Sequence, residues 1–140
     1  MYKNILVLLD SSEIAEHSVS TAIRLARVFD GKITLLQIIE ILPILQSDRK
    51  LEERALDNQA KSYLASIKER IEKEGISAKI VIKQGQPDKV ICEYTKSQDI
   101  DLVIMTSHGL GGITRWALGS VSDKVLRHSA KPVLLLRQPS

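Results

Sequence analysis

The sequence has few of the residues that would indicate a secreted or membrane-spanning protein. It contains a single cysteine, Cys92, which cannot form an intramolecular disulfide bond. Its first residues do not have the charged, apolar and small-residue layout of a secretory signal. No apolar run approaches the roughly 18 residues needed to cross a bilayer. We therefore expect a protein of the reducing cytoplasm that has no membrane partner.

Charged and aromatic residues are not arranged as they are in nucleic-acid-binding proteins. The net charge is only +3, and Lys and Arg occur as scattered singles and pairs. Aromatic residues make up 4% of the chain, so few side chains are available to stack on bases. The three histidines have no carboxylate or cysteine at metal-ligand spacing. We expect no nucleic-acid partner and no metal site built from protein ligands.

Apolar blocks alternate with amphipathic stretches along the whole chain. With 140 residues, of which 44% are hydrophobic, the chain is expected to form one domain over residues 1–140. Strands are predicted at residues 5–9, 33–39, 78–83, 101–105 and 133–136. Helical spacing or helix-start residues occupy the segments between them, with stops at Asp30-Gly31 and Gly75. This alternation predicts an α/β fold, a three-layer, doubly wound, five-stranded parallel sheet.

The strands differ in how much of each is apolar, and this difference predicts their order. Ile80 and Ile82 alternate with polar residues, which is typical of an edge strand. Right-handed crossovers leave few arrangements that place the first and fourth strands at the centre, and we predict the order 3-2-1-4-5. The fifth strand, Val133–Leu136, would then be an apolar edge that must be paired or covered. We predict a homodimer that pairs through this strand.

Two polar segments follow the central strands, at the edge where open α/β sheets bind ligands. The first is Asp10-Ser11-Ser12, and the second is the glycine-rich stretch 106–119. A helix is predicted to begin at Ser120, and its free N–H groups, its hydroxyls at Ser120 and Ser122 and the preceding Gly119 suit a phosphate. An equally open interpretation is that Ser120 only caps the helix, with Asp123 completing a capping box.

The second segment also carries a family resemblance. Thr106-Ser107-His108-Gly109, nine residues and then Gly119-Ser120 resemble the nucleotide loop of the universal stress protein family, which is usually Gly-x-x-Gly, nine residues and Gly-Ser or Gly-Thr. Asp10, Gly85-Gln86-Pro87, residues 101–105 and Lys131-Pro132-Val133 also stand where that family has them. The resemblance implies a Rossmann-like fold similar to the adenine nucleotide alpha hydrolases. It also implies a homodimer and a site for ATP, or for ADP or AMP, with Mg²⁺ or Mn²⁺ bridging the phosphates.

The resemblance gives roles to individual residues. Asp10 resembles the acid that meets the ribose or adenine, and a carboxylate suits sugar hydroxyls better than phosphates. Ile38 resembles the strand residue whose backbone reads the adenine edge. Thr106 and Gly109 resemble the positions that flank the ribose and phosphates. The predicted nucleotide-binding residues are Asp10, Ser11, Ile38, Thr106, His108, Gly109, Gly119, Ser120, Val121 and Ser122.

The sequence departs from the family pattern at three positions. Thr106 replaces the first loop glycine, Ser11 replaces the glycine that usually follows the aspartate, and Leu110 stands where a polar residue is common. We expect weaker or altered binding from these changes. The leading hypothesis is a stress-response module whose ATP occupancy modulates its conformation or its choice of partner. The alternatives are a dimeric interaction protein that has lost the nucleotide and a slow ATPase, and no catalytic residue is predicted.

Overall fold

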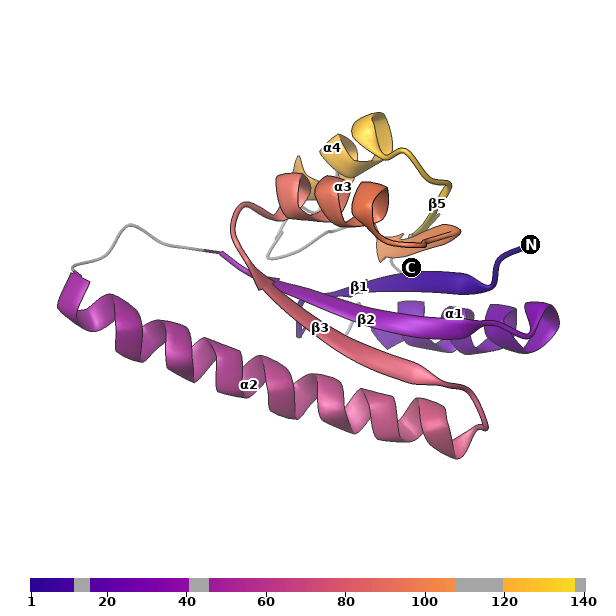
Figure 1. Cartoon of the computed structure of the whole chain (residues 1–140), viewed down its shortest axis with the longest axis horizontal. Helices are drawn as coiled ribbons and strands as arrows, with labels where there is room; N and C mark the ends of the chain where they lie inside the picture. The colour runs from indigo at the N-terminus through magenta and orange to yellow at the C-terminus, as the bar shows by residue number, and fades with distance from the viewer. Residues whose placement is uncertain (12–15, 41–45, 108–119, 138–140) are drawn as a thin grey trace.

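The chain folds as a parallel sheet covered by helices on both faces (Figure 1). The structure is a computed structural model that describes residues 1–11, 16–40, 46–107 and 120–137, without the side chains of 46–49 and 120. Its elements are β1 (Asn4–Leu9), α1 (Glu16–Phe29), β2 (Lys32–Ile39), α2 (Gln46–Lys73), β3 (Ala78–Gln84), α3 (Pro87–Ser97), β4 (Leu102–Thr106), α4 (Ser120–His128) and β5 (Val133–Leu136).

The five strands pair in the order β3-β2-β1-β4-β5, and each neighbouring pair is parallel. This order confirms the predicted fold class. It also confirms that β1 and β4 are central and that β3 and β5 form the two edges of the sheet within the chain. Parallel strands bury both faces, which explains the continuous apolar runs of the central strands.

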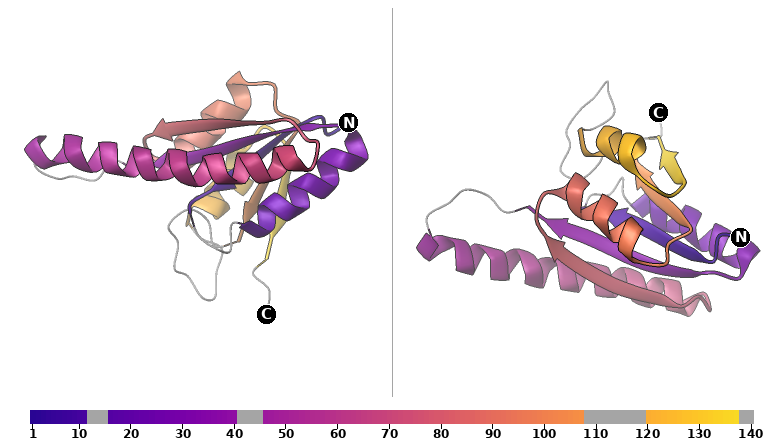
Figure 2. Two further views of the ribbon diagram at one scale, coloured as in Figure 1. Left: turned by 90° about the horizontal axis from the view of Figure 1, so that it is seen from below. Right: turned by 45° about the horizontal axis from the view of Figure 1, so that its top comes forward.

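Alternate side chains of each strand enter two separate cores. Ile5, Val7 and Leu9 of β1 pack under α1 and α2, whereas Leu6 and Leu8 pack under α3 and α4. Figures 1 and 2 show these two helix pairs on opposite faces of the sheet. Aliphatic side chains dominate both cores, as the low aromatic content predicts.

Helix α1 buries one face and ends before Asp30-Gly31, where the stop is predicted. Its buried residues are Ser18, Val19, Ala22, Ile23 and Ala26; Ile14 and Ala15, which continue the same helical spacing in the sequence, lie outside the described residues. Asp30 takes the left-handed conformation that ends the helix, with φ of 53°. Glycine is needed at position 31 for a steric reason, because a Cβ there would lie 2.9 Å from the carbonyl oxygen of Tyr2.

Helix α2 is 28 residues long and strongly polar. It runs beneath β2 and β3 and extends past the carboxyl end of β2 (Figures 1 and 2). Its buried side chains Ala60, Leu64, Ile67 and Ile71 recur at helical spacing and face the sheet. None of the helices in the described ranges is long and apolar enough to span a membrane.

Candidate functional site

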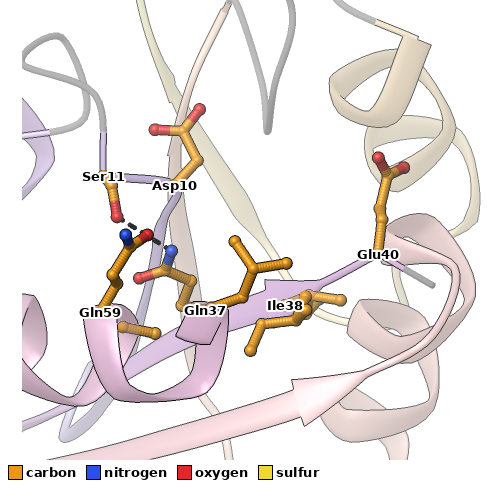
Figure 3. A pocket seen from close by; sticks show the side chains of 9 residues that line it. Asp10, Ser11, Gln37, Ile38, Glu40 and Gln59 are labelled. Carbon is orange, nitrogen blue, oxygen red and sulfur yellow. Dashed lines mark hydrogen bonds between the residues drawn. The ribbon is translucent and has the colours of Figure 1, made fainter. Parts of the chain in front are cut away.

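A pocket of about 290 Å³ opens at the carboxyl end of the sheet. We call it the β1–β2 pocket, because the ends of these strands and one side of α2 form its walls (Figure 3). Its lining residues are Asp10, Ser11, Gln37, Ile38, Ile39, Glu40, Leu56, Gln59 and Ala60. The pocket therefore brings together three residues that the sequence assigned to one site, Asp10, Ser11 and Ile38.

The pocket exists because β1 ends before β2 does. The last paired residues of the two strands are Leu9 and Gln37, so β2 continues for two residues without β1 beside it. Lys32 donates its N–H to the carbonyl oxygen of Lys3, just before β1, whereas Ile33 donates to that of Ser77, just before β3. Successive residues of a strand point their peptide N–H and C=O groups to opposite sides. The peptide groups of Ile38, six residues after Lys32, therefore point to the side of β1. Ile38 lies one residue beyond the last pair, where the pocket begins.

Ser11 turns the chain away from the sheet and holds one pocket residue in place. Its φ of 69° is in the left-handed region, which is uncommon for a residue with a side chain. Gln37 Nε2 donates a hydrogen bond of 3.0 Å to Ser11 Oγ (Figure 3). This contact gives a physical role to the serine that stands in place of the usual family glycine.

Buried polar atoms without a hydrogen-bond partner gather on the side of the sheet that carries α1 and α2. In the described part of the chain they are Ser18 Oγ, Gln37 Oε1 and the Tyr63 hydroxyl. Burial raises the pKa of Tyr63 to about 12, and the carboxylates of Glu16 and Asp10 add to this shift. Tyr63 is therefore a neutral hydroxyl close to the carboxyl end of β1.

The charge of the β1–β2 pocket is acidic. Asp10 and Glu40 line it, and among the described lining residues there is no Lys, Arg or His. Carboxylates accept hydrogen bonds from sugar hydroxyls and base amines, and their negative charge repels phosphates. A phosphorylated ligand would have to direct its phosphates elsewhere.

The amino terminus of α4 provides a place with the opposite electrostatic character. The first N–H groups of a helix have no acceptor within the helix and carry a partial positive charge. Ser122 Oγ donates a 3.0 Å hydrogen bond to the carbonyl oxygen of Thr106, and both residues are buried. This bond fixes the first turn of α4 to the end of β4, and it commits the Ser122 hydroxyl to a structural contact.

The remaining predicted residues divide into two groups. Thr106, Val121 and Ser122 gather where β4 meets α4. His108, Gly109 and Gly119 lie outside the described residues, as does the side chain of Ser120.

Four residues near the pocket were missed by the sequence reasoning: Gln37, Glu40, Gln59 and Tyr63. Gln37 had a usable signal, because it is the one polar residue in the run 35–39.

A metal centre made only of protein side chains finds no support in the described ranges. They hold no group of three or more His, Cys, Asp or Glu residues that could bind a metal ion. A hard divalent cation here would depend on the oxygens of a bound phosphate, with few ligands from the protein.

A parallel sheet in the order β3-β2-β1-β4-β5, with a polar pocket at its carboxyl edge, defines a Rossmann-like α/β domain. The sequence model of the universal stress protein family matches residues 1–137. The chain belongs to the universal stress protein family.

Known relatives resemble this chain over nearly its whole length. Universal stress protein MJ0531 of Methanocaldococcus jannaschii is 25% identical over 143 residues, which cover 99% of this chain and 84% of that protein. The solved structure of protein MJ0577 has a TM-score of 0.90 at 30% identity and covers 100% of this chain and 99% of that one. UspA from Lactobacillus plantarum has a TM-score of 0.87 at 25% identity, covering 97% and 98% of the two chains.

Three further structures of the same fold contain adenine nucleotides. They are an Arabidopsis thaliana family protein with AMP, a universal stress protein with cAMP, and the Archaeoglobus fulgidus protein with dAMP. Their identities to this chain are 20%, 21% and 20%, and their TM-scores are 0.76, 0.76 and 0.71.

Proposed function

We propose that the protein binds an adenine nucleotide, foremost ATP, with its base and ribose in the β1–β2 pocket. The observation that carries this proposal is the pocket itself. It combines the Asp10 carboxylate with the peptide groups of Ile38 at the carboxyl edge of the sheet. Family members of the same fold contain AMP, cAMP and dAMP, which supports an adenine nucleotide over other ligands.

Electrostatics orients the nucleotide in this proposal. Asp10 and Glu40 make the pocket acidic, so the uncharged base and the ribose hydroxyls belong there. The phosphates extend toward α4, whose amino terminus is bonded to the end of the central strand β4 through Ser122 and Thr106. Mg²⁺ or Mn²⁺ would be held by the phosphates, whose charge it would neutralise.

Nucleotide occupancy is proposed to reach the dimer surface through β4 and β5. Ser107 follows β4 directly and donates its N–H to the carbonyl oxygen of Leu136 at 2.8 Å. Ser107, next to the segment proposed to hold the phosphates, is therefore bonded to the last residue of the edge strand. A ligand that displaces Ser107 would move β5 and alter the surface available to a second copy or to another partner.

The nucleotide proposal is tested by calorimetric titration with ATP, ADP and AMP, with and without Mg²⁺. We expect micromolar binding of ATP that is lost in Gly119→Val, because a side chain at this position obstructs the predicted phosphate turn. Circular dichroism checks that the variant is folded, and ATP turnover is measured in the same samples. The absence of heat and of thermal stabilisation by every nucleotide would contradict the proposal. It would favour the dimeric interaction protein that Thr106 and Leu110 suggest.

The dimer is tested through the edge strand β5. Its four residues are each half-buried within the chain, and its outer edge lies opposite β4. Replacing Leu135 with Lys should convert a dimer to a monomer in solution mass measurements. Val28→Lys is the matched control, because Val28 is 74% exposed on α1. A wild-type monomer, or a folded Leu135→Lys dimer, would contradict pairing through β5.

A further inference from the structure

The side chain of Gln37 is polar where the strand requires apolar residues. Ile33 and Leu35, two and four residues earlier, belong to the core under α1 and α2, and Gln37 faces the same side. Its Oε1 is buried and has no hydrogen-bond partner in the described part of the chain. A buried carbonyl without a donor is unfavourable, so its presence in a folded protein requires a physical explanation.

The nitrogen of the Gln37 side-chain amide fixes the orientation of the amide group. Nε2 donates to Ser11 Oγ at 3.0 Å, so the carbonyl is the group left for a further contact. Gln37 lines the β1–β2 pocket beside Ile38 (Figure 3). The alternation of peptide directions along β2 turns the peptide groups of Ile38 toward the side of β1. The pocket therefore combines backbone groups with one side-chain acceptor that needs a donor.

We propose that Gln37 determines which base the pocket accepts, by accepting a hydrogen bond from the exocyclic amine of a 6-aminopurine. This inference rests on the proposed nucleotide function and deepens it. A 6-oxopurine would bring its own carbonyl oxygen against Gln37 Oε1, and two acceptors that face each other are unfavourable. Selectivity in this pocket comes from rejecting the wrong base as well as from binding the right one.

The carbonyl must become accessible when the base enters. Gln59 lines the same pocket from α2, and its side chain is exposed (Figure 3). An exposed glutamine changes rotamer at little cost, whereas Ile38 and Ile39 are held in the sheet. In this proposal the Gln59 side chain changes rotamer to admit the base. Ser11 is a positioning residue, because its hydroxyl holds the Gln37 amide in place.

The test compares ATP with inosine triphosphate, which differs only at the purine 6-position and the adjacent ring nitrogen. Wild-type protein should prefer ATP by about tenfold or more, since an unpaired buried acceptor loses a full hydrogen bond. Gln37→Met keeps the side-chain length and removes both amide groups. Its ATP to inosine triphosphate affinity ratio should approach one, mainly through weaker ATP binding. An unchanged ratio in this variant would overturn the role of Gln37.

Two further variants separate base selection from general damage. Gln98→Met is the matched control, because Gln98 is exposed at the end of α3, and its ratio should equal that of the wild type. Ser11→Ala removes the hydroxyl that holds Nε2, so the amide is free to turn and the ratio should fall through tighter binding of inosine triphosphate. Wild-type protein that binds neither nucleotide would refute the proposed function itself. Tight binding of both with equal affinity would refute only the role of Gln37.

Discussion

The two ends of the sheet differ in how completely the chain satisfies its own polar groups. At the amino end, the Asp101 carboxylate accepts hydrogen bonds from the backbone N–H groups of Lys3 and Asn4, at 3.0 and 2.9 Å. Asn4 also donates to Asp99 at 3.1 Å. Gly31 packs directly against the backbone there. The amino end is closed by contacts within the chain.

The carboxyl end is built in the opposite way. Gln37 Oε1 and the Tyr63 hydroxyl are buried there without partners among the described residues, and Ser11 takes an uncommon backbone conformation. Both ends belong to the same strands, so the fold alone does not explain the difference. One edge therefore contributes stability, whereas the other carries unsatisfied polar groups that we propose contact a ligand.

The largest effect should come from crowding the amino end. Gly31→Ala would place a Cβ 2.9 Å from the Tyr2 carbonyl oxygen and 3.0 Å from that of Lys3. We expect a loss of about 1–3 kcal/mol in the free energy of unfolding, measured by urea denaturation. The control is Gly75→Ala, where a Cβ meets nothing within 4 Å but φ is +81°, and about 1 kcal/mol is expected. Equal losses would contradict the steric account of Gly31.

Removing the Asp101 carboxylate should be the next largest change. Asp101→Ala leaves the N–H groups of Lys3 and Asn4 without their acceptor. We expect the free energy of unfolding to fall by about 1–2 kcal/mol, with nucleotide affinity unchanged. Asp99→Ala, which loses only an exposed contact, should stay within about 0.5 kcal/mol of the wild type. A folded Asp101→Ala variant that no longer binds nucleotide would contradict the claim that the amino end of the sheet serves stability and not ligand binding.

Replacing Gln37 should hardly affect stability. Gln37→Met loses the hydrogen bond to Ser11 but also removes a buried carbonyl that has no partner. These changes oppose each other, so the free energy of unfolding should shift by no more than about 0.5 kcal/mol. A loss of more than about 2 kcal/mol would show that the glutamine serves the fold, and the contrast with Asp101 would fail.

A further effect should be confined to alkaline solution. The pKa of Tyr63 is raised to about 12 in the folded chain, above the value of 10.0 for the free side chain. The stability linked to this group is therefore complete below pH 10 and is lost as the pH rises from 10 to 12. Tyr63→Phe should reduce the fall in urea midpoint between pH 9 and pH 11.

The matched variant for this experiment is Tyr94→Phe. Burial also raises the pKa of Tyr94, which lies in the other core, and no carboxylate contributes to that shift. If Tyr63→Phe leaves the alkaline fall unchanged while Tyr94→Phe removes it, the environment assigned to Tyr63 is wrong.

Much of the fold could be predicted because it depends on periodicity. The apolar runs of β1 and β4, the alternating pattern of β3 and the stop at Asp30-Gly31 each follow from local rules. Ile38 was predicted as a site residue from the family resemblance alone. Its proposed role uses the backbone, so it depends on the register of β2 rather than on the type of side chain.

The missed parts of the site depend on contacts between distant segments. The Gln37 contact with Ser11 joins residues 26 positions apart, and Gln59 reaches the pocket only because α2 extends past the end of β2. Ser122 was predicted as a phosphate ligand through its hydroxyl, but that hydroxyl donates to Thr106. Local sequence patterns do not predict hydrogen-bond partners that are distant in the sequence. The isolated glutamine in an apolar strand was the one available signal.

The most direct test of the contrast between the two ends is a map of backbone amide NMR shifts during titration with ATP and Mg²⁺. We predict that shifted amides cluster at Ser11, Gln37, Ser107 and Val121, with those of Lys3, Asn4, Gly31 and Asp101 unmoved. Shifts that concentrate at the amino end, or no shifts at saturating ATP, would contradict the assignment of the carboxyl end as the ligand site.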